Sequence, residues 1–219
     1  MKRFIASVVI ACIVMAIVEL YLAPNYLVKS ICKGVIFLVI PFFYMRFVGH
    51  LSVKTLFTVK WRNMKVPIIF AVGVSSIILL SYWIVGRYLD FSNVTIMLEE
   101  NMAIEKSNFL FVAIYIAIIN SLLEEFFFRG FAFLALMEYT TKQIASLFSA
   151  SMFSLYHIAM MTNWFSIPLF MLILFCLFIA GLFFNKLDEK VGSILPSWLV
   201  HLSANVAINM IGVMLFEII

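Results

Sequence analysis

The sequence is poor in charged residues. Of its 219 residues, 12% are Asp, Glu, Lys or Arg and 65% are hydrophobic, and the mean hydropathy is +1.14. Soluble domains contain about 25% charged and about 45–50% apolar residues. The composition therefore excludes a soluble globular protein. It predicts an all-α fold, a polytopic helical bundle whose surroundings are a lipid bilayer.

Long hydrophilic stretches, basic clusters and paired cysteines are missing as well. Without a hydrophilic stretch there is no room for a separate soluble domain, so we expect one membrane domain over 1–219, with N-terminal helices (1–108) and a motif-bearing catalytic core (109–219). Without a basic cluster no nucleic-acid partner is indicated, and the net charge of +4 suits loops that face an anionic leaflet. The three cysteines lack CxxC spacing and are predicted to be neither disulfides nor metal ligands.

The signatures of several protease classes are absent too. There is no GxSG for a serine nucleophile and no GxGD for an aspartyl pair. HExxH is also absent, so no single helix offers two histidine ligands to zinc. Any hydrolytic chemistry must therefore come from other residues.

Apolar segments dominate what is present. A span needs about 17–25 apolar residues, and we predict about seven transmembrane helices, at about 4–22, 31–48, 66–86, 109–137, 144–161, 167–184 and 193–218, with a loop over 87–108. A cytoplasmic N-terminus leaves four basic residues in the outside segments, Lys29, Lys33, Arg87 and Lys106, against ten inside, which is the expected bias. Frequent Phe, Ile, Lys and Asn favour a bacterial protein, so the predicted location is a bacterial plasma membrane.

The charges of the fourth span stand out. Fifteen uncharged residues, Phe109–Leu123, are followed by Glu124, Glu125 and, one turn later, Arg129. A charge at membrane depth costs about 2.5–3.5 kcal/mol on insertion scales, so these three need a reason. One interpretation places all of them at the headgroups, where they are solvated. The other places them inside the bundle.

Helical spacing assigns the two carboxylates different roles. Glu125 and Arg129 are i and i+4, so they share a face and can pair. Glu124 is turned about 100° away, and its own i+4 neighbour is Phe128, which cannot neutralise it. We therefore predict a structural role for Glu125 and a free, reactive role for Glu124.

Two later helices carry polar groups at a similar depth. His157 follows Phe153 by one turn, and His201 and Asn205 lie one turn apart on the last span. Ionisable groups inside a membrane are functional candidates by default. At 1.5 Å per residue, and with a tilt of about 20°, their depths overlap with that of Glu125. We therefore predict one shared polar cavity.

These motifs, EExxxR at Glu124, Glu125 and Arg129, FxxxH at Phe153 and His157, and HxxxN at His201 and Asn205, resemble the CAAX-protease and bacteriocin-processing family of intramembrane glutamate peptidases. The resemblance covers about 109–211, and the first motif extends to EExxFRG. It implies hydrolysis of peptide bonds within or beside the membrane. The implied partners are peptides or membrane proteins, which include prenylated CAAX proteins in eukaryotes and bacteriocins or signalling peptides in bacteria, where some relatives confer immunity.

The residues themselves suggest a mechanism. A carboxylate can activate water as a general base, which we expect of Glu124, with His157 sharing or relaying the proton. Donors fixed in advance stabilise an oxyanion, and His201 and Asn205 are the candidates. The alternative is a zinc site of Glu124, His157 and His201 with one open position. We favour the reaction without a metal or other cofactor.

Two rival functions use the same residues differently. In a proton-coupled transporter, buried Glu and His would relay protons, but that class predicts paired repeats with broken helices, and the sequence has no internal repeat. In a catalytically idle scaffold of the same fold, the bundle would bind a partner and confer immunity by sequestration. Intact Glu124, His157 and His201 favour the enzyme over this scaffold.

Overall fold

The fold is entirely helical over the part of the chain that the structure describes. In the computed structural model this part is residues 1–22, 26–47, 52–89 and 91–218, and every regular element in it is a helix. The predicted all-α bundle is therefore confirmed. Helix α1 (Lys2–Ile17) continues through a π-helical turn to Leu22. Helix α2 (Tyr26–Gly34) is joined through Val35–Val39 to α3 (Ile40–Phe47). The short α4 (Val53–Leu56) and the long α5 (Lys65–Val85) follow.

The second half of the chain contains the core helix and three further long helices. The core helix runs from Phe109 to Glu138. It contains α7 (Phe109–Tyr115) and α8 (Ser121–Glu125), with π-helical stretches over Ile116–Asn120 and Phe126–Ala135. The remaining helices are α6 (Ser92–Met102), which precedes it, and α9 (Lys142–Met160), α10 (Ile167–Glu189) and α11 (Leu195–Leu215), which follow it.

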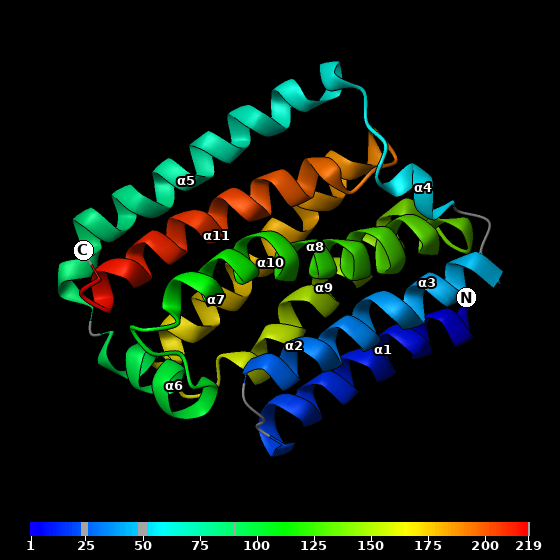
Figure 1. Cartoon of the computed structure of the whole chain (residues 1–219). Coiled ribbons are helices and arrows are strands. Elements are labelled where there is room, and N and C mark those ends of the chain that lie inside the picture. Colours follow the sequence, from blue (N-terminus) through cyan, green and yellow to red (C-terminus); the bar gives the residue numbers. More distant parts are fainter. Residues whose placement is uncertain (23–25, 48–51, 90, 219) are drawn as a thin grey trace.

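Six helices of the described chain are long and apolar enough to cross a membrane. They correspond to six of the predicted spans. The fifth predicted span, 144–161, is present as α9, but its serines, Gln143 and His157 lower its hydropathy, and it is not among the six. The two chain termini lie at opposite ends of the bundle (Figure 1).

Two predictions about the segments between spans are wrong. The predicted loop at 87–108 contains helix α6. Lys29 and Lys33, which we placed in an outside segment, lie in α2 and are 6% and 5% exposed. The second helix begins at Tyr26, about one turn before the predicted span, and carboxylates from neighbouring helices pair with both ammonium groups.

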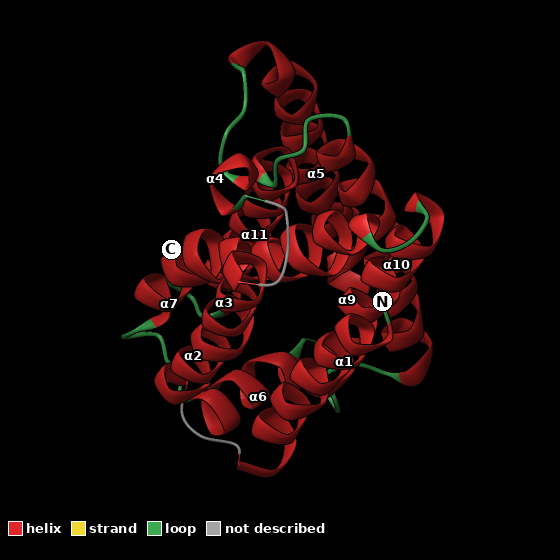
Figure 2. Ribbon diagram, turned by 90° about the vertical axis from the view of Figure 1, so that its right-hand side faces the viewer, coloured by secondary structure: helices red, strands yellow, loops and turns green. Residues whose placement is uncertain are grey.

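The helices are arranged around the core helix. The hairpin of α1 with α2–α3 lies at one edge of the bundle and α5 at the other, packed on α11 (Figures 1 and 2). Every residue from Phe126 to Leu136 is buried. A helix that is apolar all round must be covered on all sides, and aromatic rings cover this one. Phe37 stacks on Phe127 with ring centres 4.1 Å apart, and Phe4 packs at a tilt against Phe131 at 4.4 Å.

Small residues and polar contacts set the positions of the other helices. A Cβ placed on Gly181 of α10 would lie 2.9 Å from the Cα of Ala150, so α9 and α10 approach closely here, as small residues allow in membrane bundles. Ser75 of α5 donates a hydrogen bond to the carbonyl oxygen of Ser203 on α11 at 2.9 Å. These contacts fix α9 and α11, which carry the two predicted histidines.

Candidate active site

Glu125 and Arg129 form the buried ion pair that their spacing predicts. Glu125 Oε2 lies 3.2 Å from Arg129 Nε, and both side chains are fully buried. This ion pair is not also a hydrogen bond. The guanidinium carbon instead lies 4.0 Å from the centre of the Phe153 ring and 4.9 Å from that of Phe184, where cation–π attraction contributes. Arg129 is thus held between α8, α9 and α10.

Glu124 is paired, contrary to the prediction that it faces no cation. Lys33 Nζ donates a hydrogen bond to Glu124 Oε1 at 2.7 Å. Asn120 Nδ2 donates to the same oxygen at 3.1 Å, and Asn120 Oδ1 accepts from Lys33 Nζ at 2.6 Å. The cation comes from α2, which is 91 residues away in the sequence, so helical spacing on the core helix gives no sign of it.

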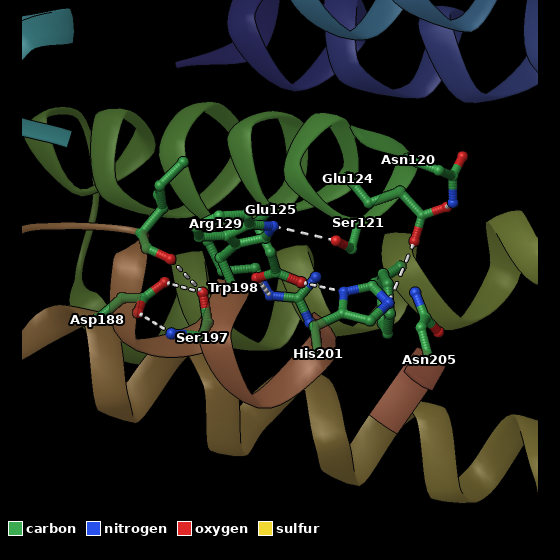
Figure 3. A network of polar contacts seen from close by, with 12 residues as sticks. Asn120, Ser121, Glu124, Glu125, Arg129, Asp188, Ser197, Trp198, His201 and Asn205 are labelled. Carbon is green, nitrogen blue, oxygen red and sulfur yellow. Dashed lines mark hydrogen bonds and ion pairs between the residues drawn. The ribbon is translucent and has the colours of Figure 1, made fainter. Parts of the chain in front are cut away.

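His201 lies between the two carboxylates (Figure 3). Its Nδ1 is 2.7 Å from Glu125 Oε1, and its Nε2 is 3.7 Å from Glu124 Oε2. A carboxylate oxygen only accepts, so Nδ1 carries the hydrogen. The ring stacks on Phe184 at 5.8 Å and meets Phe153 edge-on at 6.0 Å. His201 therefore has one fixed orientation, with Nε2 turned towards Glu124.

His157 and Asn205 lie around this cluster without a direct contact to Glu124. His157 Nδ1 is 2.7 Å from the carbonyl oxygen of Phe153, and the two rings are 4.8 Å apart. Phe153 also touches Arg129 and His201, so it joins His157 to the cluster. Asn205 Nδ2 donates to the carbonyl oxygen of Ile116 on the core helix at 3.3 Å.

Three contributors to the site were not found from the sequence. Lys33 is predicted in an outside segment, and Asn120 is not among the predicted site residues although it lies one turn before Glu124. The third is Asp188 at the end of α10, which is fully buried and accepts from the Ser197 backbone N–H at 2.9 Å and from its hydroxyl at 2.6 Å (Figure 3). These two hydrogen bonds satisfy donors at the start of α11, about one turn before His201.

A cavity of about 110 Å³ lies beside the two partners of Glu124, Lys33 and Asn120, while Glu124 itself is not part of its lining. Lys33 and Asn120 line it where it approaches that carboxylate. A second buried ion pair, Glu19 with Lys29 at 3.0 Å, lies on its polar side. Its apolar lining residues are Leu98, Ile104, Ile116, Met160 and Trp164. Such a lining suits a peptide segment, which presents a polar main chain and apolar side chains.

The zinc alternative assigns Glu124, His157 and His201 as ligands. Among the residues that the structure describes, no group of three or more His, Cys, Asp or Glu side chains is arranged to hold a metal ion. The proposed first ligand, Glu124, already has an ammonium 2.7 Å from one oxygen. A divalent ion would have to share that carboxylate with Lys33.

Comparison with known proteins identifies one family. Residues 106–207 match a family model described as Rce1-like, type II CAAX prenyl endopeptidase. The matched segment contains all six predicted site residues, and Glu19, Lys29 and Lys33 lie outside it. No curated protein and no solved structure matches the chain.

Proposed function

We propose, from the match of residues 106–207 to the Rce1-like family of type II CAAX prenyl endopeptidases, that the chain is an intramembrane endopeptidase. In this proposal Glu124 activates the attacking water. The observation that carries the proposal is the placement of Glu124. One of its oxygens is held by Lys33 and Asn120, and the other faces His201. A carboxylate held in this way can act as a general base towards a peptide in the adjoining cavity.

The first step is the attack of water on the peptide carbonyl. The 3.7 Å between Glu124 Oε2 and His201 Nε2 suits a water molecule that contacts both atoms, since polar groups at such a separation are often bridged by water. Glu124 Oε2 takes one proton from the water, and its oxygen forms the new bond to the carbonyl carbon. General base catalysis of this kind contributes about 10²–10⁴ in rate.

The second step breaks the carbon–nitrogen bond. The oxyanion needs donors that are already in place, and we assign this role to Nε2 of protonated His201 and to Asn205, which keeps one amide hydrogen after its contact with Ile116. The proton held by Glu124 passes to the leaving nitrogen as the bond breaks. The products are a carboxylic acid and an amine.

His157 is the proposed proton relay. Its Nδ1 faces the carbonyl oxygen of Phe153, which only accepts, so Nδ1 carries the hydrogen. Nε2 of the neutral ring is then an acceptor. The second carboxylate, Glu125, orients His201 and neutralises Arg129.

The substrate side follows from the proposed orientation. A cytoplasmic N-terminus places the link residues Ile104 and Trp164, which line the cavity, at the extracytoplasmic end. The substrate segment would then approach from outside. Protease protection of an N-terminal tag in sealed vesicles tests this orientation, because a tag that is cleaved only from the extracytoplasmic side would reverse it.

The activity is tested with the purified protein in lipid nanodiscs and two fluorogenic peptides. One peptide is farnesylated and ends in a CAAX sequence, and the other is an apolar peptide of equal length without the lipid. We expect the wild type to cleave at least one of them and Glu124→Gln to cleave neither.

The matched control is Glu189→Gln, the same chemical change in a surface pair with Lys142. It should retain full activity, because surface ion pairs contribute only about 0–1 kcal/mol. Cleavage by Glu124→Gln at the wild-type rate would contradict the proposed base, and a wild type that cleaves neither peptide would contradict the endopeptidase proposal.

A further inference from the structure

The helical hairpin formed by α1 and α2 contributes three charges to the interior, Glu19, Lys29 and Lys33. Glu19 pairs with Lys29 at 3.0 Å, and Lys33 with Glu124 at 2.7 Å, each side chain being at most 8% exposed. Buried ion pairs are weak contributors to stability, because desolvation of the charges offsets their attraction. Three of these residues lie outside the segment that matches the family. Their burial therefore calls for a functional reason.

Lys33, Asn120 and Glu124 form a closed triangle of contacts. Lys33 donates to Glu124 and to Asn120, and Asn120 donates to Glu124. Two of these contacts end on Oε1 of Glu124, and the third joins the two donors, Lys33 and Asn120, to each other. Rotation of the carboxylate would break at least two of them.

We propose that Lys33 is a positioning residue for Glu124: it holds Oε1, with Asn120, so that the negative charge stays on the carboxylate and Oε2 faces His201. This inference rests on the proposed function. Its consequence is that the hairpin outside the family segment completes the active site. The third N–H of the ammonium remains available to the cavity that Lys33 lines.

The alternatives for Glu124 without Lys33 show why the contact matters. His201 Nε2 is 3.7 Å from the other oxygen, beyond hydrogen-bond distance, so even the protonated ring that serves the oxyanion does not hold Oε1. His157 has no direct contact with the carboxylate, Tyr156 carries no charge at neutral pH, and Arg129 pairs with Glu125. A buried carboxylate without a cation takes up a proton or turns towards water, and either outcome removes the base.

The first measurement needs no substrate. Thermal unfolding midpoints are compared for Lys33→Met, Glu124→Gln and the double variant. Lys33→Met leaves a buried carboxylate without its cation and should lower the midpoint. The double variant, which leaves no charge unpaired, should unfold at a higher temperature than Lys33→Met. Additive effects of the two substitutions would overturn the pairing, whether or not the protein is a peptidase.

The second measurement uses whichever of the two fluorogenic peptides the wild type cleaves. Lys33→Met should lower kcat by at least about 10², the scale of a lost electrostatic contact in catalysis, with KM changed by less than about threefold. Lys33→Arg, which keeps the charge, should have a kcat at least about tenfold higher than that of Lys33→Met. These effects separate positioning from a merely structural role, since a destabilised but intact site would not regain kcat through charge alone.

The comparison variant is the double substitution Glu19→Gln with Lys29→Met. It removes an ion pair from the same cavity one turn earlier on α2 without touching Glu124, and it should act on KM more than on kcat. If Lys33→Met does not fold, Asn120→Ala and Lys33→Arg carry the test, each with an expected kcat about tenfold below wild type. A kcat within threefold of wild type in Lys33→Met, or in both substitutes, would overturn the proposal while leaving Glu124 as the base.

Discussion

Glu125 and His201 are joined by a 2.7 Å contact between Oε1 and Nδ1, which links the core helix to α11. The same carboxylate uses its other oxygen for Arg129 at 3.2 Å. One residue thus orients the imidazole and neutralises the guanidinium. This division explains why the two adjacent glutamates are not equivalent.

The first prediction concerns this carboxylate. Glu125→Gln keeps the shape but removes the charge, which leaves Arg129 buried without a counterion. Breaking a buried ion pair costs about 3–5 kcal/mol, so we expect a lower unfolding midpoint and a kcat reduced by about tenfold or more. Chemical or thermal unfolding in nanodiscs, together with peptide cleavage, measures both. The double variant with Arg129→Met should unfold at a higher temperature than Glu125→Gln, and equal midpoints would contradict the direct pair.

The second prediction concerns the cavity next to Glu124. Ser30 lines it, and its hydroxyl bonds only within α2, to the carbonyl oxygen of Tyr26. Ser30→Phe should fill the space and lower kcat/KM by about tenfold, chiefly through KM. Ser30→Ala removes the same hydroxyl and leaves the cavity open, so it should cleave peptide like the wild type. Equal kcat/KM for the two variants would show that the substrate binds elsewhere.

The third prediction concerns metal. If Glu124 acts as a base beside Lys33, then dialysis of the purified enzyme against a strong chelator should leave kcat unchanged. Added zinc should give no gain, because the ammonium already occupies one oxygen of Glu124. Metal content measured by mass spectrometry accompanies the assay. Activity that disappears with the chelator and returns with zinc would establish the alternative site of Glu124, His157 and His201.

The fourth prediction concerns the contact between α9 and α10. Gly181→Ala introduces a Cβ about 2.9 Å from the Cα of Ala150, which forces the helices apart. Overpacking of this kind costs about 1–3 kcal/mol, and we expect a lower unfolding midpoint together with reduced activity, because α9 carries His157. Gly73→Ala is the matched control, since nothing lies within 4 Å of that new Cβ. Similar midpoints for the two variants would show that the helices can separate without cost.

The membrane class, the helical fold and the family followed from local features. Hydropathy and length locate the spans because each must match the bilayer thickness. The pairing of Glu125 with Arg129 follows from helical spacing within one segment. The family match over 106–207 confirms the resemblance that the three motifs indicated.

Other features depended on contacts between distant segments. Polar side chains lower the hydropathy of α9, and in the structure two of them find partners inside the bundle: Ser149 donates to the carbonyl oxygen of Phe128, and Ser154 to that of Leu174. Hydropathy averaged over a window reports the polarity of the side chains but not whether they have hydrogen-bond partners. The roles proposed for His157, His201 and Asn205 remain predictions, although His201 lies between the two glutamates.

The sequence by itself determined that this chain is a helical membrane protein with carboxylate and imidazole groups at one depth, because spacing along a helix and the thickness of a bilayer are properties of single segments. Only the tertiary structure decided that Lys33 faces Glu124. That contact joins residues 91 positions apart, and a lysine near a helix end has the same local pattern whether it reaches water or a buried carboxylate.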